Sequence, residues 1–128
     1  MKIEHVAYSV SEPAKVAAWY EKNLGFKIVR SMDTAPVMHF LADDSGKMLI
    51  EIYNNPAVKV PDYRAMDPLL LHLALVSTDP IKDKERLLAA GATVAADYLK
   101  TPMGDELIML RDPWGFAVQL CRRTKPMM

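Results

Sequence analysis

Apolar and polar residues recur along this chain in two matching series, and each series contains one helix-like segment. In the first segment Val16, Tyr20 and Leu24 are spaced four residues apart, which places them on one face of an α-helix. Ser11 is the expected N-cap of this helix, and Gly25 can adopt the left-handed conformation that ends it. The pattern therefore predicts an amphipathic helix between Ser11 and Gly25.

A second helix with the same plan is predicted before Gly91. Thr78 or Asp79 is the expected N-cap, and Pro80 stands in the first turn, where its missing N–H costs nothing. The buried face of this helix is expected to consist of Ile81, Leu87 and Leu88. Gly91 is the expected stop signal.

Short runs rich in β-branched and aromatic residues surround both helices and predict strands. They cover residues 3–10, 26–32, 37–42 and 48–53 in the first half, and residues 69–76, 93–99, 106–110 and 116–121 in the second. Each half therefore consists of a strand, a helix and three strands. This order predicts an α+β protein built from two βαβββ modules.

The two halves match each other as an internal repeat. Pro13 and Pro80 are 67 residues apart, and so are His5 and His72. Two similar copies of about this length suggest a pseudo-twofold pair. We therefore expect one domain over residues 1–128, with module one at 1–54, a connector at 55–68 and module two at 69–123.

Four polar residues stand at matched positions inside the apolar strands: His5 and His72, and Glu51 and Gln119, which are 68 residues apart. Because side chains alternate across a strand, Ile50 and Ile52 point towards the helix and Glu51 points to the other face. The same alternation puts all four polar groups opposite the helices, on a face that lines a cleft if the sheets curl. Two imidazoles, a carboxylate and an amide oxygen suit a divalent ion such as Zn, Ni, Co, Fe or Mn.

Charge and composition exclude several classes of function. The chain has 16 basic and 16 acidic residues and no basic patch apart from a short C-terminal run, so nucleic acid is not an expected partner. The longest apolar run, residues 69–76, is interrupted by His72 and is too short to span a membrane. Cys121 is the single cysteine and the first residues lack an apolar signal segment, so we expect a cytoplasmic protein.

The paired modules, opened by "IEHVAYSV" and "LLLHLALV" and closed by "MLIEIY" and "RDPWGFAVQL", resemble the vicinal oxygen chelate superfamily. This superfamily includes glyoxalase I, bleomycin resistance proteins and extradiol dioxygenases. The resemblance implies a curved eight-stranded mixed sheet with a cleft and with helices on its outer face. It also implies that His5, Glu51, His72 and Gln119 are the metal ligands, and that a homodimer forms.

The resemblance leaves the reaction open. Many glyoxalases have a base glutamate where this chain has Gln119, but Glu51 occupies the mirror position and is the candidate catalytic base. We therefore expect a glyoxalase-like, metal-dependent lyase or isomerase acting on a small oxygen-rich substrate. The alternatives are a metal-free small-molecule binding or resistance protein and an extradiol-type dioxygenase, which would use two histidines and one carboxylate.

Two further features are candidates for substrate binding. The guanidinium groups of Arg30, Arg64 and Arg111 can each grip a carboxylate or phosphate at two points. The connector, which includes Asp62 and Tyr63, is long enough to act as a lid over a site.

Overall fold

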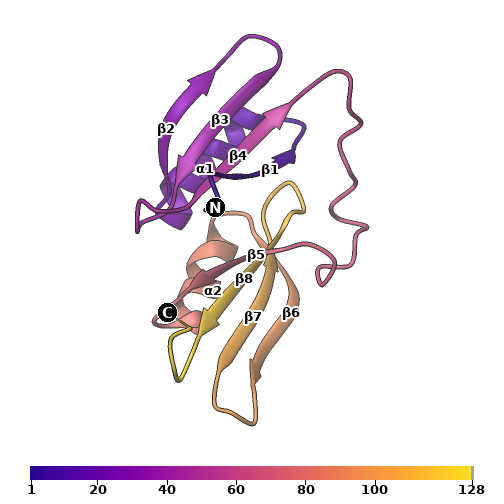
Figure 1. Ribbon diagram of the computed structural model, residues 1–128. Coiled ribbons are helices and arrows are strands. Elements are labelled where there is room, and N and C mark those ends of the chain that lie inside the picture. The colour runs from indigo at the N-terminus through magenta and orange to yellow at the C-terminus, as the bar shows by residue number, and fades with distance from the viewer. Residues whose placement is uncertain (128) are drawn as a thin grey trace. The chain divides into compact units, whose positions relative to one another are not determined.

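The computed structural model describes residues 1–127 and divides after Pro61 into two compact units (Figure 1). The first unit contains β1 (Val6–Ser9), α1 (Pro13–Leu24), β2 (Lys27–Met32), β3 (Val37–Ala42) and β4 (Leu49–Asn54). The second unit, from Asp62 on, contains β5 (Leu73–Val76), α2 (Pro80–Ala89), β6 (Thr93–Lys100), β7 (Glu106–Arg111) and β8 (Ala117–Arg122). The division falls inside the expected connector.

Each unit forms a mixed sheet with the same strand order. The order is β1-β4-β3-β2 in the first unit and β5-β8-β7-β6 in the second, and the first strand of each unit runs parallel to its neighbour. The predicted α+β class and its two βαβββ modules are confirmed. Among the described residues the eight strands form two hydrogen-bonded sheets of four instead of one sheet of eight. Neither helix found there has the length and apolar character needed to cross a membrane.

Helix α1 covers one face of the first sheet. Val16 and Tyr20 on the helix are fully buried, and so are Leu41 and Ile52 on β3 and β4, against which the helix packs. Burying such side chains is the main source of stability in a unit of this size. Gly25 ends the helix with a φ of 76°, as predicted.

The predicted start of α1 was wrong by one residue. Glu12 and not Ser11 occupies the N-cap position, and its side chain makes no cap hydrogen bond in the described structure. Pro13 follows directly and fixes the backbone of the first turn, so the helix begins without a side-chain cap.

Helix α2 starts as predicted but buries less of its surface. The Asp79 side chain caps it by accepting a hydrogen bond from the Lys82 backbone N–H at 3.2 Å. Leu87 is buried, whereas Ile81 and Leu88 are 46% and 37% exposed, so two of the three expected core positions were wrong. The helix packs against β7 and β8, and its buried residues are Pro80 and Leu87.

Replacing Asp79 with alanine is expected to lower the free energy of unfolding by about 1 kcal/mol, because the first-turn N–H groups lose their acceptor. Urea unfolding followed by circular dichroism measures the change. The matched control is Ser11→Ala, at the corresponding helix start, which makes no cap bond and should leave the unfolding midpoint unchanged. Equal losses in the two variants would contradict this account of the cap.

The repeat extends to the strand register. In the first unit Ala7 of β1 pairs with Glu51, and in the second unit Ala74 of β5 pairs with Gln119. His5 precedes Ala7 by two residues, as His72 precedes Ala74. Both histidines lie immediately before their strands and not within them, which is a small correction to the predicted strand limits.

The turn before β8 is held by a buried carboxylate. Asp112 is 2% exposed, and its Oδ1 accepts hydrogen bonds from the backbone N–H groups of Trp114 and Phe116, both at 2.9 Å. Gly115 completes the turn with a φ of 95°, which L side chains rarely adopt. This turn sets the point at which β8 starts, and therefore the position of Gln119.

Candidate functional site

In the first unit the structure brings His5 and Glu51 together. Ile50 and Ile52 are buried on the helix side of β4, and Glu51, with a side chain 16% exposed, points to the opposite face as predicted. The Nε2 atom of His5 lies 3.3 Å from Oε2 of Glu51. Phe40, the cross-strand neighbour of Glu51, presents its ring to His5 at right angles, with ring centroids 5.4 Å apart.

The other nitrogen of His5 is also engaged. Its Nδ1 contacts the carboxylate of Glu4. The hydrogen bond to Glu4 raises the pKa of His5 above its ordinary value, and the negative charge of Glu51 adds to this effect, while burial opposes it. A carboxylate on Nδ1 also fixes the orientation of the ring, so that Nε2 faces Glu51.

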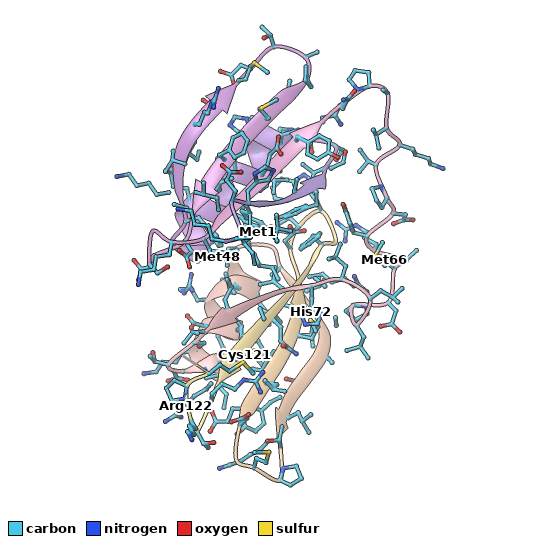
Figure 2. The ribbon with its side chains drawn as sticks, in the orientation of Figure 1. Met1, Met48, Met66, His72, Cys121 and Arg122 are labelled. Atoms are coloured by element: carbon cyan, nitrogen blue, oxygen red, sulfur yellow. The ribbon has the colours of Figure 1, made fainter. Side chains whose placement is uncertain are left out.

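His72 occupies the corresponding place in the second unit, immediately before β5 (Figure 2). Its Nδ1 lies 3.0 Å from the backbone carbonyl oxygen of Pro68, which can only accept a hydrogen bond. His72 therefore donates from Nδ1 in its neutral form, and the lone pair lies on Nε2. Each candidate histidine thus has Nδ1 bound to an oxygen and Nε2 as its potential ligand atom, an arrangement usual for metal-binding histidines.

The side-chain amide of Gln119 has a hydrogen-bond partner within its own strand. It lies on β8 opposite Met109 of β7, on the face away from the buried Val118 and Leu120. The thiol of Cys121 donates a hydrogen bond to Oε1 of Gln119, with Sγ and Oε1 3.2 Å apart. A carbonyl oxygen has a second lone pair, so Oε1 can still bind another group.

Cys121 itself is a buried thiol, and it is labelled on β8 in Figure 2. Burial raises its pKa above the ordinary value, because the thiolate form would lose its hydration. It therefore stays protonated at neutral pH and acts as a donor to Gln119. The sequence indicated this contact only in that residues 119 and 121, two apart in a strand, lie on the same face of the sheet.

A pocket of about 350 Å³ opens on this face of the second unit. Strands β6, β7 and β8 and the segment before β5 supply its walls, which are formed by Asp67, Pro68, Leu69, Ala96, Asp97, Leu99, Leu107, Met109 and Gln119. Its size is at the lower end of the range for small-molecule sites. Because Pro68 also binds His72, the histidine and the pocket wall are fixed to the same segment.

The arginine predictions are corrected in part by the structure. The guanidinium of Arg111 donates to the backbone carbonyl oxygens of Tyr63, Met66 and Gly115 at 2.7, 2.7 and 3.0 Å. Arg64 donates to the carbonyl oxygen of Pro113. Both guanidinium groups bind the protein's own backbone, so they are not positioned to grip an anionic substrate.

The same bonds bear on the lid hypothesis for the connector. Tyr63 is buried, with its ring 5.0 Å from that of Phe116, and Arg111 binds its carbonyl oxygen. This part of the connector is therefore packed against the second sheet, which is not the behaviour of a mobile lid.

The donor atoms of the four predicted residues fit a divalent metal ion. Neutral imidazole nitrogens, a carboxylate and an amide oxygen are all suitable ligands, and both Nδ1 contacts leave Nε2 as the ligand atom. Among the residues that the structure describes, no group of three or more His, Cys, Asp or Glu side chains is close enough to hold an ion. The first unit brings His5 and Glu51 together, whereas in the second unit His72 contacts the carbonyl oxygen of Pro68 and Gln119 contacts the thiol of Cys121.

Comparison with protein families identifies the chain. The model of the glyoxalase/bleomycin resistance protein/dioxygenase superfamily matches residues 2–120. The chain belongs to this superfamily. The predicted resemblance to vicinal oxygen chelate proteins is thereby confirmed.

Several solved structures share the fold. A glyoxalase family protein from Bacillus cereus has a TM-score of 0.79 at 14% identity, covering 94% of this chain and 93% of its own. TnmS3, an antibiotic binding protein from Streptomyces sp. CB03234, has a TM-score of 0.71 at 22% identity, covering 97% and 99%. A glyoxalase I mutant from Zea mays has a TM-score of 0.75 at 21% identity, covering 97% of this chain and 46% of its own. No curated protein matches the sequence significantly.

Proposed function

We propose that this superfamily member is a divalent-metal-dependent enzyme of the glyoxalase type, acting on a small oxygen-containing substrate. His5, Glu51, His72 and Gln119 would bind the ion, which is one of Zn, Ni, Co, Fe or Mn. The observation that carries the proposal is the repeated geometry. Each histidine precedes by two residues the strand position that pairs with Glu51 or Gln119, and each has its Nδ1 bound to an oxygen.

The chemistry that these residues support is proton transfer next to a carbonyl group. A bound divalent ion would polarise the carbonyl oxygen as a Lewis acid. Glu51 would take the proton from the neighbouring carbon, since its carboxylate faces away from the core and has one oxygen towards His5. The ring of Phe40 restricts the movement of His5, whose Nε2 is the proposed ligand atom beside that carboxylate.

A second candidate function is metal-free binding of a small molecule. The pocket beside Gln119 favours it, because most of its wall is apolar and it lies wholly in the second unit. Binding in such a pocket is driven by burial of apolar surface and needs no ion. The small-molecule partner, the homodimer and the cytoplasmic location remain predictions that follow from the sequence and the resemblance.

Metal titration separates the two candidates. The wild type, stripped of metal and titrated with Ni²⁺, Zn²⁺ or Co²⁺ in a calorimeter, is expected to bind one ion per chain. His72→Ala is expected to weaken binding by at least about 100-fold, since loss of a ligand exceeds the effect of an outer-shell change. Absence of tight uptake by the wild type would favour the metal-free function.

The remaining histidine provides a matched control. His39 is buried on the helix side of β3, and neither ring nitrogen has a hydrogen-bond partner among the described residues. The nearest carboxylate oxygen, Oδ1 of Asp33, is 3.9 Å from Nε2, beyond hydrogen-bond distance. His39→Leu keeps the volume and should leave metal affinity unchanged, whereas a loss equal to that of His72→Ala would show that the assay reports folding.

A further inference from the structure

The pocket of the second unit has mostly apolar walls. Leu99, Leu107 and Met109 line it from β6 and β7, and Leu69 lines it from the segment before β5. Leu69 and Leu99 are 76% and 56% exposed. Large apolar side chains gathered at an open hollow lose contact with water when a ligand covers them, so an apolar ligand gains affinity there.

The charges around the pocket disfavour an anion. No lysine or arginine lines it among residues 1–127, and the two charged residues that do are Asp67 and Asp97. Both carboxylates are already engaged. Oδ1 of Asp67 accepts a hydrogen bond from the Leu69 backbone N–H at 2.9 Å, and Oδ1 of Asp97 accepts one from Lys84 at 2.9 Å. The carboxylate of Asp67 would repel an anionic ligand, the ion pair of Asp97 with Lys84 adds no net charge, and no cation lines the wall among the described residues.

The polar group that remains for a ligand is the amide of Gln119. Its Oε1 accepts the hydrogen bond from Cys121. Its Nε2 has two N–H donors and no hydrogen-bond partner among the described residues. A donor at the wall of an apolar pocket selects ligands that present an acceptor oxygen, because an unpaired N–H is costly once water is excluded.

We propose that this pocket binds an uncharged, largely apolar small molecule whose carbonyl oxygen accepts a hydrogen bond from Nε2 of Gln119. Cys121 is a positioning residue, since its thiol holds Oε1 and thereby turns Nε2 outward. The inference rests on the proposal that the chain binds a small molecule, and it names the class of that molecule. It does not depend on a bound metal ion, because Nε2 and Oε1 are different atoms of the amide.

Three naphthalene probes of similar size test this class. The first is 1-acetonaphthone, which is neutral and has a carbonyl group; the second is 1-ethylnaphthalene, which lacks an acceptor; and the third is 1-naphthoate, which is anionic at pH 7. Each is titrated into the full chain in the presence of EDTA, with the Gln119 side-chain amide followed by nuclear magnetic resonance. We expect the ketone to bind about 5- to 10-fold more tightly than the hydrocarbon, and the carboxylate to bind more weakly than both.

Variants separate the hydrogen bond from the shape of the pocket. Gln119→Leu, followed through the backbone amide signals of the pocket residues, should bind the ketone and the hydrocarbon equally, and it should bind the hydrocarbon at least as tightly as the wild type does. Cys121→Ser keeps a donor to Oε1 and should keep the preference for the ketone, whereas Cys121→Ala should reduce it. A merely structural role for Cys121 would change the affinities for both probes together.

The inference is overturned if the naphthoate binds as tightly as the ketone, if the ketone binds no more tightly than the hydrocarbon, or if no probe shifts the Gln119 resonance. Because EDTA is present throughout, these outcomes are independent of metal uptake. A chain that binds no metal but prefers the ketone would refute the metal-dependent reaction and leave the pocket assignment intact. A chain that binds metal but fails the probe test would refute the pocket assignment and leave the metal-dependent reaction intact.

Discussion

Deuterium uptake at the carbon next to a carbonyl group is expected to slow by about 10²- to 10⁴-fold when Glu51 is replaced by glutamine, which is the range for loss of a general base. An amide cannot accept the proton, but its oxygen can still face His5 as the carboxylate does now at 3.3 Å. The exchange is measured by nuclear magnetic resonance in deuterium oxide, with dihydroxyacetone as a simple hydroxyketone and with the metal ion that binds best. Metal affinity is measured on the same sample, so that loss of the base is distinguished from loss of the ion.

The internal repeat provides a control for this prediction. Gln119 occupies in the second unit the register position that Glu51 occupies in the first. The double variant Glu51→Gln with Gln119→Glu moves the carboxylate to the equivalent position and should recover part of the lost rate. Full activity of the single Glu51→Gln variant, with normal metal uptake, would remove Glu51 from the role of base.

Gly115→Ala is expected to lower the free energy of unfolding by about 3 kcal/mol, the sum of backbone strain and a steric clash. The φ of Gly115 is 95°, and a Cβ there would lie 2.3 Å from Cγ of Arg64 and 3.0 Å from its backbone nitrogen. The Arg64 side chain can move aside, but its backbone is held, because its N–H donates to Oδ1 of Asp62 and Arg111 binds the neighbouring carbonyl oxygen of Tyr63.

A second glycine separates strain from clash. Gly46 also has a positive φ, 66°, but an added Cβ there would meet nothing within 4 Å. Gly46→Ala should therefore lose only about 1 kcal/mol, from the backbone conformation alone. Urea unfolding of both variants gives the comparison. Equal losses in the free energy of unfolding at the two positions would mean that the contact with Arg64 does not contribute to the loss at Gly115.

Local periodicity was sufficient to predict much of the fold. The alternation that places Ile50 and Ile52 in the core and Glu51 on the other face follows from strand geometry alone, and the burial pattern of β4 agrees. The repeat was visible because equivalent residues kept nearly the same separation. The same method failed at Ile81 and Leu88, since amphipathic spacing marks an apolar stripe but does not say how wide a contact the sheet offers it.

Contacts between distant segments could not be predicted in the same way. The sequence makes Arg111 a candidate substrate anchor, because it does not distinguish a guanidinium that binds a ligand from one that donates to a backbone carbonyl oxygen, as Arg111 does. The pocket depends on residues from β6, β7 and the segment before β5, whose closeness is a property of the folded chain. The donor role of Cys121 could be recognised only from the distance between its Sγ and Oε1 of Gln119. Its place on the same face of the strand as Gln119 is equally compatible with an inert buried thiol.

The three hydrogen bonds that Arg111 donates to backbone carbonyl oxygens also determine where the chain tolerates inserted segments. They hold Tyr63 and Met66, so a linker, affinity tag or cleavage sequence inserted between these residues would break the guanidinium contacts. Residues 56–59 are exposed, and in the described structure the N–H groups of Ala57 and Val58 donate locally to Asn55. Insertions for biosensors or for separate expression of the two repeats therefore belong before Pro61, with Asp62 and all that follows it kept together.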